Sequence, residues 1–102
     1  MSWLLAVLMA AVLGTAPRTH TVEIRGMKFH PAELTVVSGD TIVWINRDIV
    51  PHTATVNGSW DTGMLTQGAT GRHIAGRPGT IHYTCTVHPT MQGTLIITKE
   101  RS

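Results

Sequence analysis

Four side chains with metal-binding chemistry occupy two short stretches of this chain. Cys85, His88 and Met91 lie within seven residues of one another, and His52 follows Pro51 well upstream. Cys85 is the single cysteine, so it has no partner for a disulfide within the chain. One thiolate, two imidazoles and one thioether are the ligand set of a mononuclear blue-copper electron-transfer site. The residue types therefore predict one copper ion per chain, held by His52, Cys85, His88 and Met91.

The spacing of these ligands indicates how a fold could bring them together. Residues 80–85 alternate between polar and apolar types, which places Cys85 on the inward face of a predicted β-strand. His88 and Met91 then come from the loop that follows this strand. His52 begins a different predicted strand, so we expect it to reach the same end of the fold and tie the loop to a sheet.

Short predicted strands with turn residues between them fill the chain from residue 19 onward. Residues 57–71, which contain four glycines, are predicted to form a loop. Many short strands with frequent turns are typical of an all-β, antiparallel Greek-key β-sandwich, here with about seven to eight strands. The predicted strands span residues 21–25, 27–30, 33–37, 41–46, 53–56, 72–75, 80–85 and 93–98.

The N-terminal segment differs in composition from the rest of the chain. Residues 3–13 are almost entirely apolar, and Gly14, Thr15 and Ala16 follow them. This pattern predicts a secretory signal peptide over residues 1–16, although the segment contains no Lys or Arg. The domain over residues 19–99 would then be periplasmic. The alternative is a retained membrane tether, but the apolar run is shorter than the roughly 20 residues that span a bilayer.

Composition excludes several classes of function. The net charge is only +2, and the basic residues are scattered, so a nucleic-acid partner is not expected. Exported proteins usually pair their cysteines, and metal binding explains why Cys85 is alone. Asp48 and Asp61 form no recognisable catalytic pair. Four protein ligands leave no open metal position for a substrate, so we expect that the protein is not an enzyme. We also expect it to be a monomer.

Several motifs resemble those of one known family. The chain resembles the cupredoxins of the plastocyanin/azurin superfamily and, among them, the amicyanins, which share the short ligand loop. The resemblance implies that His52, Cys85 and His88 are strong equatorial copper ligands and that Met91 is a weak axial ligand. The matching stretches are residues 27–31, 39–46, 51–52 and 83–93.

This resemblance implies a soluble, periplasmic one-electron carrier. Its redox partners, such as a dehydrogenase donor and a c-type cytochrome acceptor, would dock near the exposed edge of His88. An apolar ring of Met27, Pro51, Met64 and Pro89 is expected around that edge. Two alternatives stay open. One is a periplasmic copper carrier or storage protein, and the other, for which the chain is short, is a domain of a larger copper enzyme.

Two positions depart from the pattern of the amicyanins. Thr53 follows the first histidine ligand, where the family usually carries an asparagine that braces the ligand loop. We expect the Thr53 hydroxyl to bond Thr86 or to have no partner. Val87 replaces a proline of the loop and therefore keeps its backbone N–H. We expect this N–H to donate to the Cys85 sulfur, which would raise the reduction potential.

Overall fold

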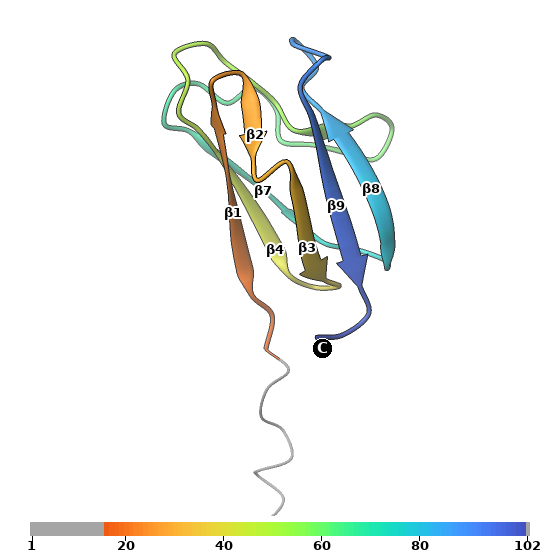
Figure 1. The fold of residues 1–102 in the computed structure, drawn as a ribbon. Coiled ribbons are helices and arrows are strands. Elements are labelled where there is room, and N and C mark those ends of the chain that lie inside the picture. Colours follow the sequence, from red (N-terminus) through yellow and green to blue (C-terminus); the bar gives the residue numbers. More distant parts are fainter. Residues whose placement is uncertain (1–15, 102) are drawn as a thin grey trace, which may run out of the picture.

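The computed structural model describes residues 16–101, which form two β-sheets packed face to face (Figure 1). One sheet has the strand order β2-β1-β4-β7, and the other has the order β3-β9-β8-β5-β6. No helix long and apolar enough to cross a bilayer occurs in this part of the chain. The nine strands are β1 (Thr19–Arg25), β2 (Lys28–His30), β3 (Glu33–Val37), β4 (Thr41–Asn46), β5 (Thr55–Val56), β6 (Trp60–Asp61), β7 (Thr70–Ile74), β8 (Gly79–Thr84) and β9 (Gln92–Thr98).

The predicted all-β sandwich is confirmed, but its pairing is mixed. β1 pairs with β4 in parallel, and β3 pairs with β9 in parallel. The remaining strand pairs are antiparallel. The structure also places β6 inside the predicted loop over residues 57–71, where it pairs with β5. The predicted signal segment lies outside the described residues except for Ala16.

Alternating burial along the strands builds the core between the sheets. β4 and β9 each bury every second residue, as expected for strands with one face turned to the core. Trp44 of β4 is fully buried. Its ring meets Tyr83 of β8 edge-on, with centroids 5.4 Å apart. Phe29 of β2 contacts the same tyrosine at 4.7 Å. These aromatic contacts join the two sheets.

Asp40 fixes the end of the sandwich at which both ends of the described chain, residues 16–101, lie (Figure 1). Its carboxylate is fully buried and accepts hydrogen bonds from Arg101 at 3.0 Å and from the backbone N–H groups of Arg18 and Val37. The His20 ring lies 2.9 Å away. The Arg101 guanidinium holds the pKa of Asp40 well below its ordinary value, although burial acts in the opposite direction.

The opposite end of the sandwich carries the predicted ligands. β8 runs toward this end and reaches it just before Cys85, and the connection from β8 to β9 turns the chain back (Figure 1). β4 runs to the same end and leads into the loop that contains His52. Two strands from different sheets therefore deliver the two parts of the candidate site to one place.

Candidate metal centre

The structure brings together three of the four predicted ligands. The side-chain donor atoms of His52, Cys85 and His88 all lie within 4.8 Å of one another. Cys85 Sγ is 3.8 Å from His52 Nδ1 and 4.0 Å from His88 Nδ1. Metal–ligand bonds of about 2.0–2.3 Å in a trigonal arrangement would place sulfur and nitrogen about 3.7 Å apart. The three donor atoms therefore fit a single metal ion in a trigonal Cys–His–His site.

The strand β8 and the turn after it place the sulfur in the interior. Tyr83 and Cys85 are both buried, which continues the inward alternation of β8 into the loop. The backbone N–H of Cys85 donates to the carbonyl of Met91 at 3.3 Å, and the N–H of Met91 donates to the carbonyl of His88 at 2.9 Å. These two bonds close the ligand loop on itself, so its three candidate ligands stay close together.

Met91 lies in this closed loop, and its side chain is 4 % exposed. It belongs to the buried cluster that also contains Cys85. A buried thioether beside a thiol and two imidazoles suits a soft metal such as copper. Its role as the weak axial ligand stays a prediction.

Two backbone bonds hold His52 in place. Its N–H donates to the carbonyl of Leu65, and the N–H of Leu65 donates back to the carbonyl of His52, at 3.1 and 2.7 Å. The His52 side chain is fully buried, so its ring could not bond to water if it lost a hydrogen-bond partner. The segment that carries Leu65 thus acts as a backbone clamp for the ligand histidine.

Asp48 orients the His52 ring. Its Oδ2 lies 2.9 Å from His52 Nε2. Because a carboxylate accepts hydrogen bonds, Nε2 carries the ring proton and Nδ1 presents its lone pair toward Cys85. Burial alone would raise the pKa of Asp48, but hydrogen bonds from the Met27 N–H, His52 and the Gly26 N–H outweigh burial and lower that pKa overall. The carboxylate is therefore ionised at neutral pH.

Asn46 organises the loop that carries Asp48 and His52. Its buried side-chain amide donates to the carbonyls of Val50 and Leu65 at 2.9 and 2.8 Å. Its Oδ1 accepts the N–H of Asp48 at 2.9 Å. Sequence reasoning missed the roles of Asn46 and Asp48. The available signal was an acidic residue four positions before a candidate ligand, at the end of a strand.

Thr53 connects the two ligand segments, as one of our two expectations for it foresaw. Its Oγ1 accepts the N–H of Thr86 at 3.0 Å and lies 3.2 Å from the Thr86 hydroxyl. On its other side it lies 2.8 Å from the hydroxyl of Thr55, which donates to Asp61 Oδ1 at 2.9 Å. A chain of hydroxyl groups thus takes the place of the asparagine side chain that the resembling family usually carries at the position of Thr53.

The prediction that Val87 donates to the Cys85 sulfur is wrong. Within residues 16–101, the backbone donor to Sγ is the N–H of Thr53, at 3.3 Å. Val87 instead exposes 47 % of its surface on the ligand loop. Val87 and Thr53 are 34 positions apart in the chain. Val87 is close to Cys85 in the sequence, whereas the fold brings Thr53, which is distant in the sequence, to the sulfur.

Exposed apolar residues occur in the segments that carry the candidate ligands and in neighbouring turns. His88 is only half-buried, and exposed residues flank it on both sides in the loop. The residues just before His52 are also exposed, and Ile49 is 84 % exposed. Met27 and Met64, two members of the predicted apolar ring, are exposed. We call the set Met27, Ile49, Val50, Pro51, Met64, Val87 and Pro89 the apolar rim.

Comparison with known proteins supports the predicted resemblance to cupredoxins. The family model of the cupredoxin-like domain matches residues 1–97. Amicyanin of Paracoccus denitrificans is 34 % identical over 86 residues, which cover 74 % of this chain and 63 % of that protein. Amicyanin-alpha of Methylorubrum extorquens is 30 % identical over 82 residues, covering 74 % and 69 % of the two chains. The chain thus spans somewhat less than two thirds of the first of these relatives.

Solved structures give the same fold. An oxidized amicyanin variant with a proline-to-alanine substitution superposes with a TM-score of 0.73 at 32 % identity, covering 78 % of this chain and 82 % of that chain. A copper-containing nitrite reductase from Thermus scotoductus gives 0.73 at 26 % identity, covering 87 % of this chain and 24 % of that chain. On its sequence match, its sandwich and its Cys–His–His cluster, the chain belongs to the cupredoxin-like family.

Proposed function

We propose that this chain is a blue-copper protein that carries one electron at a time. Copper would be held by His52, Cys85 and His88, with Met91 as the weak axial ligand. The observation that carries the proposal is the cluster of one thiol and two imidazoles, whose donor atoms lie within 4.8 Å of one another. When bound, copper supplies the change between Cu(II) and Cu(I) that stores and releases the electron.

The surrounding residues suit electron transfer because they hold the ligands nearly fixed. The Leu65 bonds and Asp48 position His52, and the Thr53–Thr86 contact ties the ligand loop to the segment after His52. The Thr53 N–H places a positive dipole at the Cys85 sulfur and stabilises the thiolate charge. A site that rearranges little between oxidation states transfers electrons with a small energetic penalty.

The half-buried His88 offers the electron a short route to the surface. We propose that redox partner proteins dock on the apolar rim around this ring. The apolar rim would exclude water and tolerate more than one partner, since it carries few charges that fix a docking orientation. We also propose that residues 1–16 are an export signal, that residues 19–99 form the domain, and that the protein acts as a monomer in the periplasm.

A carrier is favoured over an enzyme by the ligands that the structure offers. In the described part of the chain, His, Cys, Asp and Glu side chains converge into a single potential metal group. A second, substrate-binding metal therefore has no ligand set among residues 16–101.

The absorption spectrum of the copper-loaded chain tests this proposal. Cu(II) should give an intense blue thiolate-to-copper band in the wild-type protein, and Cys85→Ser should abolish it. Thr86→Ser, which changes the neighbouring position but keeps the hydroxyl, is the control and should keep the band. Pale copper absorption that does not depend on Cys85 would show that the thiol is not a ligand.

Redox titration separates the electron carrier from the copper carrier. An electron carrier should cycle reversibly between its two oxidation states and keep its copper when a chelator is added in either state. A protein that delivers copper should instead lose Cu(I) to the chelator rapidly. Rapid loss would favour the storage or delivery function over electron transfer.

A further inference from the structure

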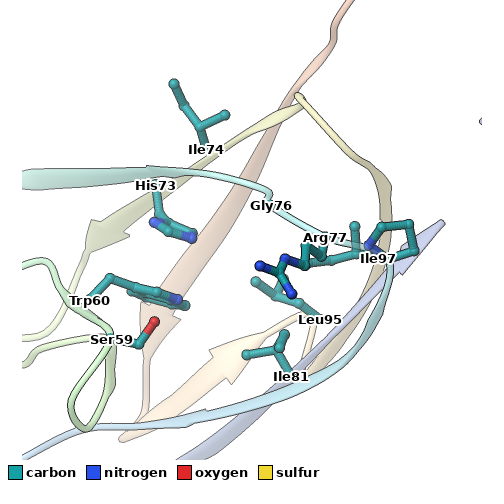
Figure 2. Close-up of a pocket in the computed structure, with 10 residues that line it drawn as sticks. Ser59, Trp60, His73, Ile74, Gly76, Arg77, Ile81, Leu95 and Ile97 are labelled. Atoms are coloured by element: carbon teal, nitrogen blue, oxygen red, sulfur yellow. The ribbon is translucent and has the colours of Figure 1, made fainter. Parts of the chain in front are cut away.

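A cavity of about 280 Å³ opens between the two sheets, away from the metal ligands (Figure 2). It lies along the seam between β7, an edge strand, and the first half of β8. β5 pairs with β8 only at Thr84, so the start of β8 lacks a neighbour on this side. None of His52, Cys85, His88 and Met91 lines the cavity.

The cavity has an apolar floor and an aromatic wall. Ile81 and Leu95 form part of the floor. Trp60 and His73 form the wall, with their rings stacked at 4.1 Å and only 16° from parallel. Burial lowers the pKa of His73, so the imidazole is neutral at pH 7. The wall is therefore uncharged, and it presents the edges of two stacked rings, which aromatic ligands can contact edge to face.

One positive charge faces this apolar space. Figure 2 shows the Arg77 guanidinium directed into the space between the aromatic wall and the floor. Among the described residues, Arg77 takes part in no ion pair, whereas Arg25, Arg47 and Arg101 each have an acidic partner. None of the lining residues is acidic. A guanidinium can bind a carboxylate through two parallel hydrogen bonds.

We propose that this cavity binds a small aromatic carboxylate. The ring would occupy the apolar space beside Trp60, and the carboxylate would pair with Arg77. The volume suits such a ligand, because an apolar cavity of about 150 Å³ in another protein already accepts benzene. The remaining space holds a short acidic side chain. The proposal is independent of the metal centre, so either can fail without the other.

Titration of the full chain with 3-phenylpropionate, followed by two-dimensional ¹H–¹⁵N NMR, tests the proposal. The indole N–H of Trp60 should shift in a saturable way, with a dissociation constant of about 1 mM or tighter for a ligand of this size. The indole N–H of Trp44, which is fully buried in the core, should shift much less. Absence of a saturable shift at Trp60 would overturn the proposal.

Two arginine variants separate a specific site from general charge attraction. Arg77→Gln should weaken binding by about tenfold or more, since a charge-assisted bidentate pair is lost. Arg72→Gln removes the same charge from β7 at a position that does not line the cavity, and it should change binding less than about twofold. Equal weakening by both variants would contradict the proposed site.

The neutral ligand 3-phenylpropanamide completes the test. It keeps the ring and the chain but removes the negative charge, so it should bind at least about tenfold more weakly to the wild type. It should bind equally well to wild type and Arg77→Gln. If the amide binds as tightly as the acid, the cavity selects apolar ligands only and the assignment of a carboxylate partner is wrong.

Discussion

Asp48 serves two parts of the molecule with one carboxylate. It fixes the proton of His52 on Nε2, and it accepts the backbone N–H groups of Gly26 and Met27 in the turn between β1 and β2. Met27 has a positive φ of 61°, which a non-glycine residue adopts at some cost. The ligand histidine and this strained turn of the apolar rim are therefore coupled through a single side chain.

Replacing Asp48 should weaken metal binding without removing a ligand. In Asp48→Asn, the charge that stabilises the Nε2 proton is lost, so His52 becomes a weaker base and a less well oriented ligand. We expect copper affinity to fall by about 10–100-fold, the usual effect of losing a partner of a metal-bound histidine. Competition with a chelator of known affinity measures this. Glu33→Gln, an exposed charge change, is the control, and an equal effect of both variants would contradict the assignment.

Thr53 should contribute to stability through the groups that it satisfies. Thr53→Ala leaves the Thr86 N–H without its acceptor and removes a neighbour of the buried Thr55 hydroxyl. We expect the free energy of unfolding to fall by about 1–3 kcal/mol. Urea denaturation measures this, with the exposed Thr66→Ala as the control. A loss as small as that of Thr66→Ala would show that the hydroxyl chain does not brace the loop.

The sequence predicts the candidate ligands better than the residues that support them. Cysteine, histidine and methionine have few alternative reasons to occur at this spacing, so their types alone indicate a metal. Asn46, Asp48 and Thr53 are common surface residue types, and their roles depend on contacts across the fold. The same limit explains why we expected a hydrogen bond from Val87 to the sulfur and missed the one from Thr53.

At the scale of elements, the Tyr83 side chain of β8 lies against the backbone of β9 at Gly93. These residues are paired across the two strands, and a Cβ atom on Gly93 would overlap the Tyr83 ring and hydroxyl. The ring lies over the glycine because Phe29 and Trp44 occupy its other sides. Burial raises the pKa of Tyr83 to about 12, so its hydroxyl stays neutral.

Adding one methyl group at Gly93 should therefore disturb the core. Gly93→Ala forces Tyr83 out of its position, and we expect a loss of about 1–3 kcal/mol in the free energy of unfolding. Gly76→Ala is the matched control, because its added Cβ has no neighbour within 4 Å, and it should change stability by less than about 0.5 kcal/mol. Equal unfolding midpoints in urea for the two variants would show that the sheet absorbs the methyl group.

Strand positions are predictable here, whereas strand directions are not. The sequence predicts strands over residues 41–46 and 93–98, and the structure confirms both as β4 and β9. Both segments are apolar runs, so the alternating burial that the structure shows along them could not be read from residue types. Such burial occurs in parallel and antiparallel strands alike, so it carries no information about direction. β1 and β4 are separated by β2 and β3, of which β3 belongs to the other sheet. Their parallel pairing follows from that crossover.

At the scale of the whole molecule, Asp40 links distant parts of the chain. It contacts residues near both termini and the turn before β4. Asp40→Asn should destabilise the fold at pH 7 by roughly 1–3 kcal/mol, because a buried charge-assisted network is lost. Thermal and urea unfolding measure the change. The sequence contains no sign of this network, since Asp40 and Arg101 lie 61 positions apart.

The effect of Asp40→Asn should depend on pH. The pKa of Asp40 is lower in the folded state than the value of about 3.9 in the unfolded chain, so its contribution to the free energy of unfolding is complete above about pH 5, where both states are ionised. As the pH falls below about 5, the unfolded state binds the proton first and the contribution shrinks. The difference in the free energy of unfolding between wild type and Asp40→Asn should therefore become smaller at low pH. Glu100→Gln, an exposed control, should show little difference at any pH, and a constant gap for Asp40→Asn would contradict the assignment.

The contact between Arg101 and the carbonyl of Ala16 keeps the two ends of the described chain together, and the candidate copper ligands occupy the far end of the sandwich (Figure 1). A bead attached near Ala16 or Arg101 would therefore hold the molecule upright, with the His88 edge facing the solution. Immobilisation at this end should leave docking unhindered. The fold thus separates the end suited to attachment from the end at which redox partners are proposed to dock.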